Sequence, residues 1–198
     1  MTASRYTKTA VVLHWLIAFG LLVMFVLGWY MADLPKDSPK IPAIDLFDLG
    51  IYSFQLEEPA SVRGFYFNLH KSIGVTLLVL IAFRIFWRLT HQPPALLATL
   101  KSWESKLAGL GHKVLYVLMI AVPISGLIMA SYSKFGVRWF GLPLIPGLDD
   151  KVMRENLAEV HELVGIILLV VIAVHVLGAL KHKFIDKDET MKRMTLHG

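Results

Sequence analysis

Four of the eight histidines lie within or at the edge of long apolar stretches of the sequence: His14, His70, His161 and His175. Ionisable side chains are costly inside a lipid bilayer, so each of them is a candidate functional residue. Imidazole suits iron as a ligand, and its neutral ring nitrogens add no buried charge. A single membrane histidine often only hydrogen-bonds a neighbouring helix, so the four are informative chiefly through their arrangement.

Their spacing places them at two depths. His161 and His175 are 14 residues apart, which on a helix corresponds to about 21 Å along the axis and to one face within about 40°. One helix therefore offers two ligands at different levels. His70 precedes Arg84 by the same 14 residues, which places His70 near the level of His161.

The other level is marked by charged boundaries. His14 lies six residues after Lys8, and His175 lies six residues before Lys181. Both histidines are thus roughly 9 Å inside the same boundary. We therefore expect two pairs, His14 with His175 and His70 with His161.

Two histidines on different helices match the two axial ligands of a six-coordinate haem iron. The chain has no cysteine, which excludes disulfides, thiolate-held iron–sulfur clusters and the C-x-x-C-H attachment of c-type haem. The arrangement therefore predicts two non-covalent haems b, with the iron held by His14, His70, His161 and His175.

The residue four positions after each proposed ligand is small: Ala18, Gly74, Gly165 and Ala179. Residues at this spacing share a helix face, so they would leave room for a flat porphyrin. The alternative is that small residues simply pack helices together. His112 has Tyr116 at that position and adjoins Lys113, so it is not counted as a ligand. Arg84 and Lys71 are candidate partners of the haem propionates, or else cations that reach the membrane surface.

The elements that must position these histidines are four apolar segments: Thr9–Ala32, Phe65–Arg88, Val114–Ser133 and Leu163–Leu180. Apolar residues make up 56% of the chain and charged residues 18%, so lipid is the expected solvent. Each segment approaches the ~20 residues that a membrane-spanning helix needs. We expect an all-α membrane protein, a four-transmembrane-helix up-down-up-down bundle with one domain over residues 1–198.

The charge distribution predicts the orientation. Twelve of the 20 basic residues fall on the side that carries both termini, which favours cytoplasmic termini. The basic residues flank apolar runs and form no stripe with interleaved aromatics, so nucleic-acid binding is not expected. The uncharged stretch Thr9–Ala32 is 24 residues long, too long for a secretory signal, and is expected to remain as the first helix. The external connection Asp33–Leu69 is long, and a short interfacial helix or a lid is expected there.

Several short motifs resemble the bacterial cytochrome b561 family: His14-Trp15, Leu69-His70-Lys71-Ser72-Ile73-Gly74, Gly111-His112, Pro123-Ile124-Ser125-Gly126, His161-Glu162 and His175. The resemblance covers nearly the whole chain. It implies that His14, His70, His161 and His175 bind two haems b. It also implies a quinone-linked electron carrier of the inner membrane, and an activity that oxidises superoxide and reduces ubiquinone.

Three functions therefore remain open. The leading one is an oxidoreductase of the bacterial inner membrane that passes single electrons from an external donor, superoxide or a cation-bearing protein, to ubiquinone. The external loops are rich in acidic residues, which favours a cationic donor unless Lys71, Arg63 and Arg154 form a positive rim. The alternative is a cytochrome b subunit that anchors and oxidises a soluble partner enzyme. A third is a haem-free transporter with a histidine proton relay.

Overall fold

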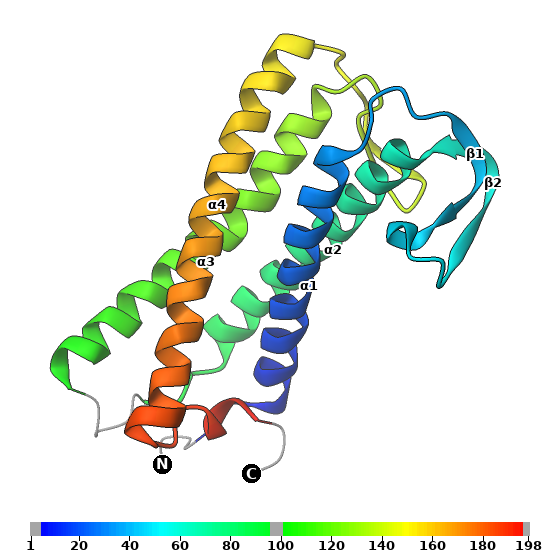
Figure 1. Ribbon diagram of the computed structural model, residues 1–198. Coiled ribbons are helices and arrows are strands. Elements are labelled where there is room, and N and C mark those ends of the chain that lie inside the picture. Colours follow the sequence, from blue (N-terminus) through cyan, green and yellow to red (C-terminus); the bar gives the residue numbers. More distant parts are fainter. Residues whose placement is uncertain (1–4, 96–100, 196–198) are drawn as a thin grey trace.

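The computed structural model describes residues 5–95 and 101–195. Its main elements are four long helices, α1 (Lys8–Asp33), α2 (Val62–Thr90), α3 (Ser102–Ser131) and α4 (Lys151–Lys181), which form one bundle (Figure 1). Each helix is long and apolar enough to cross a membrane. The expected four-helix membrane bundle is therefore confirmed.

The first and last described segments lie at the same end of the bundle, here called the terminal end (Figure 1). The Trp15 indole of α1 donates a hydrogen bond to the carbonyl of Met194, at 2.9 Å. The Trp87 indole of α2 donates to Thr7 Oγ1, also at 2.9 Å. The opposite end carries the two long connections and is called the loop end.

Side-chain caps explain where three of the helices begin. Thr7 caps α1, Ser61 caps α2 and Asp150 caps α4, each by accepting a hydrogen bond from the backbone amide three residues later. Such caps satisfy amides that have no partner within the helix.

The last carbonyls of α1 are satisfied by an arginine from α2. The Arg63 guanidinium donates to the carbonyls of Met31, at 3.1 Å, and Ala32, at 3.2 Å, and also to that of Leu34. Arg63 therefore ties the start of α2 to the end of α1. The guanidinium thus serves as a helix cap and keeps its positive charge at the loop end.

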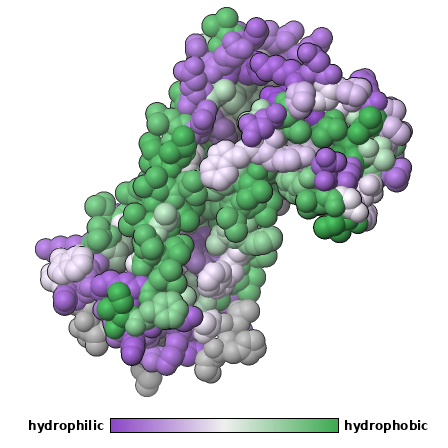
Figure 2. All heavy atoms as spheres, viewed as in Figure 1, coloured by the Kyte–Doolittle hydropathy of each residue, from purple (hydrophilic) through white to green (hydrophobic). Residues whose placement is uncertain are grey.

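The bundle has a small apolar core and an apolar outer surface. The buried core lies midway along the helices and consists of Ile17, Leu21, Leu77, Ile81, Leu115 and Leu168. Many large apolar side chains point outwards, and Figure 2 shows a continuous hydrophobic band along the helices. Such a surface suits lipid, because helices there need no polar outer face.

The connection between α1 and α2 is a hairpin of β1 (Lys40–Asp45) and β2 (Ser53–Ser61), with a 3-10 turn at Leu46–Asp48 between them. It takes the place of the interfacial helix or lid that the sequence allowed. The reason is tertiary packing, since Ile44 is buried against Leu27 and Tyr66 at the helix ends. The Tyr66 hydroxyl also accepts a hydrogen bond from the Phe47 amide, at 2.6 Å.

The connection between α3 and α4 is a smaller hairpin of β3 (Val137–Trp139) and β4 (Leu142–Ile145). Four hydrogen bonds attach it to α2, of which the longest runs from Ser72 Oγ to the Arg138 carbonyl at 3.4 Å. Lys71 Nζ donates to the Gly136 carbonyl at 2.8 Å, the Phe140 amide donates to Ser72 Oγ at 2.9 Å, and the Trp139 indole donates to Thr76 Oγ1 at 3.0 Å. The turn thus covers α2 directly beside His70.

Candidate functional site

The structure brings together both histidine pairs that the sequence predicted. His14 of α1 and His175 of α4 have ring centres 6.3 Å apart and form the terminal-end pair. His70 of α2 and His161 of α4 have ring centres 6.4 Å apart and form the loop-end pair. A metal ion with imidazole nitrogens about 2 Å away on both sides separates two ring centres by roughly 6 Å. Both ring-centre distances fit an iron held between two histidines.

A third histidine joins the terminal-end pair. The His112 ring centre lies 5.5 Å from that of His175. The sequence placed His112 at the membrane boundary, because the apolar run begins at Val114. The structure begins α3 at Ser102, so His112 lies inside the bundle.

An arginine completes the terminal-end cluster. Arg84 Nη2 lies 3.3 Å from His14 Nδ1, and Nη1 donates to the Ala10 carbonyl at 3.4 Å. Arg84 and Arg88 both face the Tyr116 ring, at 5.9 and 5.5 Å from its centre. Arg84 therefore lies beside the pair, and a role as a propionate partner stays a prediction. Lys71, the other candidate, is instead bonded to the Gly136 carbonyl.

At the loop-end pair, a serine fixes the orientation of one histidine. Ser125 Oγ donates to the Val122 carbonyl at 2.8 Å and lies 2.9 Å from His161 Nδ1. With the serine proton given to the Val122 carbonyl, His161 Nδ1 is the donor in the second hydrogen bond. The lone pair of Nε2 is then free for a metal, an arrangement typical of ligating histidines.

The other member of the loop-end pair has an unused polar atom. His70 Nδ1 is one of the few buried side-chain polar atoms without a hydrogen-bond partner among the described residues. Buried polar groups are normally satisfied, so such an atom calls for an explanation. A site that accepts a polar or metal-containing group is one such explanation.

Two glycines allow the loop-end rings their positions. A Cβ on Gly126 of α3 would lie 2.9 Å from His161 Cε1, which is too close, and one on Gly28 of α1 would lie 3.5 Å from His70 Cε1. Among the small residues that the sequence singled out, Gly165 faces open space, whereas Gly74 has Met24 nearby. The sequence analysis did not select Gly28 or Gly126.

One spacing relates all of these residues. Each helix contributes two of them, 14 residues apart: His14 and Gly28, His70 and Arg84, His112 and Gly126, His161 and His175. Fourteen residues return nearly to the same helix face. The terminal-end level is therefore built from His14, Arg84, His112 and His175, and the loop-end level from Gly28, His70, Gly126 and His161.

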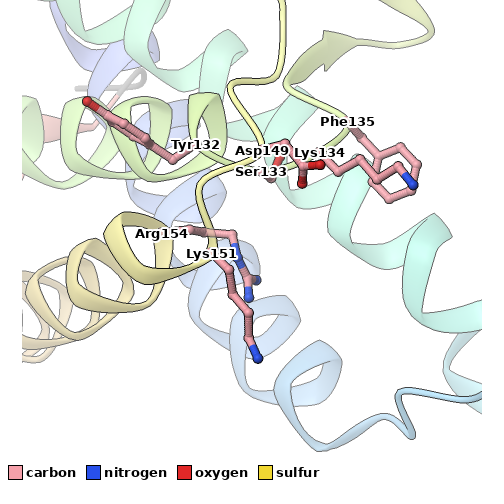
Figure 3. Close-up of a pocket in the computed structure, with 7 residues that line it drawn as sticks. All are labelled: Tyr132, Ser133, Lys134, Phe135, Asp149, Lys151 and Arg154. Atoms are coloured by element: carbon pink, nitrogen blue, oxygen red, sulfur yellow. The ribbon is translucent and has the colours of Figure 1, made fainter.

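A hollow of about 280 Å³ opens at the loop end (Figure 3). It is lined by Tyr132, Ser133, Lys134, Phe135, Asp149, Lys151 and Arg154. Three of these side chains are cationic and one is anionic. Arg154 precedes His161 by seven residues on α4, or about 10 Å along the helix. The hollow thus lies above the loop-end pair.

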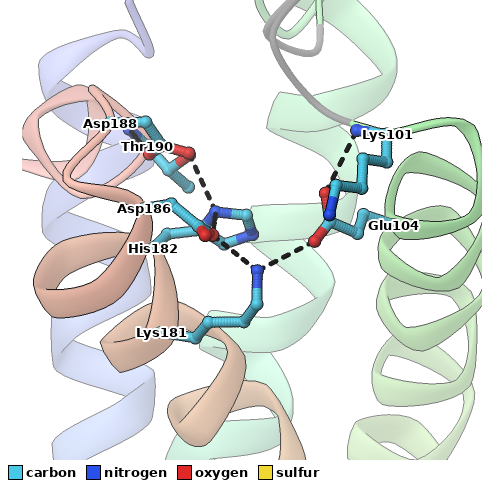
Figure 4. A network of polar contacts seen from close by, with 7 residues as sticks. All are labelled: Lys101, Glu104, Lys181, His182, Asp186, Asp188 and Thr190. Atoms are coloured by element: carbon cyan, nitrogen blue, oxygen red, sulfur yellow. Dashed lines mark hydrogen bonds and ion pairs between the residues drawn. The ribbon is translucent and has the colours of Figure 1, made fainter.

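A polar cluster closes the terminal end (Figure 4). Lys181 Nζ bonds Glu104 at 2.8 Å and Asp186 at 2.6 Å, and His182 Nδ1 lies 3.0 Å from Asp186 and 2.8 Å from Asp188. Burial raises the pKa of Asp188, but hydrogen bonds from neighbouring groups including His182 outweigh it and hold that pKa below its usual value. The His182, Asp186 and Asp188 donor atoms lie within 4.8 Å of one another, as in metal sites. Because the Lys181 ammonium already neutralises Asp186, we interpret the cluster as an ion-pair network that fastens the C-terminal segment.

Four membrane-spanning helices with two facing histidine pairs are the arrangement expected of a membrane cytochrome of the b type. The comparison with known families agrees, since the profile of the prokaryotic cytochrome b561 family matches residues 5–197. The chain belongs to the prokaryotic cytochrome b561 family.

Individual relatives match over nearly their full length. The chain is 32% identical to cytochrome b561 homolog 2 of Escherichia coli K12 over 198 residues, covering 98% of this chain and 92% of the relative. It is 27% identical to cytochrome b561 homolog 1 of the same organism, covering 96% and 97%. It is also 26% identical to the probable superoxide oxidase CybB of Yersinia pestis, covering 96% and 95%. Family membership makes this protein a multi-pass membrane oxidoreductase of electron transport that uses haem b.

Proposed function

We propose that this protein binds two haems b and passes single electrons from a donor at the loop end to ubiquinone in the bacterial inner membrane, with both termini in the cytoplasm. The observation that carries the proposal is the pair of facing histidine couples, with ring centres 6.3 and 6.4 Å apart and each drawn from two helices. His14 and His175 hold one iron, and His70 and His161 hold the other. Haem supplies a reversible one-electron carrier when bound.

The protein groups around the histidines have separate tasks. Ser125 keeps His161 in the tautomer whose Nε2 can ligate, and Gly126 leaves the space that the His161 ring occupies. Arg84 supplies a cation at the terminal-end pair that can balance a propionate. The apolar core between the two levels, which includes Leu21, keeps water away from the path between the pairs.

Superoxide is the donor that the loop-end hollow suits best. The lining of the hollow carries Lys134, Lys151 and Arg154 against Asp149, and a cationic cleft raises the local concentration of an anion. Glu155 lies beside two of these cations, 3.9 Å from Lys151 and 3.5 Å from Arg154, and offsets part of their charge. One relative carries the name of a probable superoxide oxidase. In the proposed reaction, two superoxide anions each lose one electron to become dioxygen, and ubiquinone takes up two electrons and two protons to become ubiquinol.

The haem sites are tested by counting haem per chain in histidine variants. The purified protein should contain close to two haems. His14→Ala or His175→Ala should remove one of them, and His70→Ala or His161→Ala should remove the other. His112→Ala removes the third ring of the terminal-end cluster and should keep both haems. If His112→Ala loses a haem while His14→Ala keeps two, the terminal-end pairing is wrong.

The donor is tested by stopped-flow reduction of the haem with superoxide. Arg154→Gln together with Lys134→Gln should slow the second-order reduction, and the remaining rate should depend less on ionic strength. Lys192→Gln, at the terminal end, is the control and should leave the rate unchanged. If the double variant is reduced as fast as the parent protein, the hollow does not guide the donor. If superoxide fails and a co-purified subunit reduces the haem, the role of a subunit in a larger enzyme replaces this one.

A further inference from the structure

The β1–β2 hairpin forms a lobe at the side of the loop end and turns back towards the terminal end (Figure 1). The ring centre of Phe47 lies 4.9 Å from that of Tyr30, and Ile44 shares a buried cluster with Leu27. Tyr30 and Leu27 precede the last residue of α1, Asp33, by three and six residues. At 1.5 Å per residue, the lower part of the hairpin therefore lies about 4–9 Å below the end of α1.

The membrane reaches this level on the neighbouring helix. Trp29, beside Tyr30 in the sequence, exposes 59% of its surface, and Val26, one turn below, exposes 49%. Large apolar side chains on the outside of a membrane helix face lipid, and tryptophan is enriched where lipid meets water. The boundary between headgroups and acyl chains thus lies near Trp29, beside the lower part of the hairpin.

The tip of the hairpin is apolar and exposed. Leu49, Ile51 and Tyr52 expose 61%, 81% and 59% of their surfaces. In Figure 2 the lower end of the lobe formed by the hairpin is hydrophobic. In water, three such neighbouring side chains would be an unusual surface for a loop.

The tip is also a defined turn. The Gly50 amide donates to Asp45 Oδ2 at 2.7 Å, and the Leu46 amide donates to the Tyr52 carbonyl at 2.8 Å. Gly50 has a φ of +68°, a conformation that favours glycine. The backbone of the turn is therefore fixed by its own hydrogen bonds, and the apolar side chains point outwards from it.

We propose that the hairpin tip, residues 49–52, inserts into the lipid leaflet at the loop end of the bundle. Lipid covers the tip, which lies about 5–10 Å deep at the boundary between headgroups and acyl chains, as other interfacial segments do. The insertion is shallow because Asp48 adjoins the tip and remains among the headgroups. Glu58 lies seven residues after Ile51, or about 23 Å along an extended strand, and stays in water.

The absence of cysteine makes a direct test available. Single cysteines at Ile51→Cys, Glu58→Cys and Val79→Cys would each carry a nitroxide spin label in the haem-loaded, full-length protein in phosphatidylcholine vesicles. Val79 is the lipid reference, because it is exposed on the outer surface of α2. Power-saturation EPR then compares collisions with dioxygen, which concentrates in lipid, and with a water-soluble nickel chelate.

The label at position 51 should collide more with dioxygen than with nickel, by a smaller ratio than the deeper label at position 79, and the label at position 58 should show the reverse. Unchanged haem spectra in all three variants establish that the fold is intact. If positions 51 and 58 are equally open to nickel, the hairpin stands in water and the proposal fails. If position 51 is shielded from both reagents, protein covers the tip, and the proposal fails as well.

Discussion

Removal of the Ser125 hydroxyl should raise the midpoint potential of one haem and leave the other unchanged. His161 Nδ1 donates its hydrogen bond to Ser125 Oγ over 2.9 Å. This hydrogen bond increases electron density on the ring, makes Nε2 a stronger ligand and favours ferric iron. In Ser125→Ala the ferric state loses that support, so the iron becomes easier to reduce.

The size of the shift follows from the energy of the hydrogen bond. A neutral hydrogen bond contributes about 0.5–1.5 kcal/mol. If all of it favours the oxidised state, the one-electron relation of 59 mV per 1.4 kcal/mol gives an upward shift of about 20–65 mV. This is an upper range, because the reduced state keeps part of the same hydrogen bond.

The measurement is a potentiometric titration of the haem absorbance, resolved into two components. Ser125→Thr keeps a hydroxyl and should restore the parent potential. Ser131→Ala is the matched control, since Ser131 makes the same type of hydrogen bond to a carbonyl three residues earlier, that of Ile128, without touching a histidine. The reasoning is refuted if both components shift equally, or if Ser125→Ala and Ser125→Thr behave alike.

Three other perturbations have defined outcomes. Gly126→Ala places a methyl group 2.9 Å from His161 Cε1 and should lower the occupancy of the loop-end haem, because overpacking costs about 1–3 kcal/mol. Gly28→Ala places its methyl group 3.5 Å from His70 Cε1 and should change the haem count little. Equal losses of haem in the two variants would contradict this reasoning. Arg63→Ala removes the cap of α1 and should lower the free energy of unfolding by about 1.5–3 kcal/mol, measured as a lower thermal midpoint in detergent. An unchanged midpoint together with slower reduction by superoxide would instead assign Arg63 to donor binding. Acid acetone should extract all the haem, because the chain has no cysteine to retain it, and haem left on the protein would rule out b-type binding.

The features that depend on one helix at a time could be predicted from the sequence. The four spans follow from apolar length, and the two levels follow from the 14-residue interval between His161 and His175. The pairing of these two with His14 and His70 required only matched depths, and the structure brings the same rings together. Whether they ligate iron remains a prediction.

Features that depend on contacts between distant segments could not be predicted. The role of Ser125 depends on α3 packing against α4, and that of Arg63 depends on the end of α1 lying beside the start of α2. His112 was set aside because Tyr116 stands four residues after it and Lys113 adjoins it at the edge of the apolar run, although the helix already begins at Ser102. The 14-residue interval between His112 and Gly126 was the signal that could have identified both.

The 14-residue interval shared by the four helices also limits which insertions and deletions this protein can tolerate during evolution. A single inserted or deleted residue between the two levels turns one level by about 100° relative to the other and shifts it by 1.5 Å. A ligand or a glycine would then leave the interior of the bundle. Only an insertion close to a whole number of turns, of about four or seven residues, restores the facing, and the other three helices would need a matching insertion. The distance between the two histidine pairs therefore cannot be adjusted in small steps, and point substitutions around each pair are the available route to altered electron transfer.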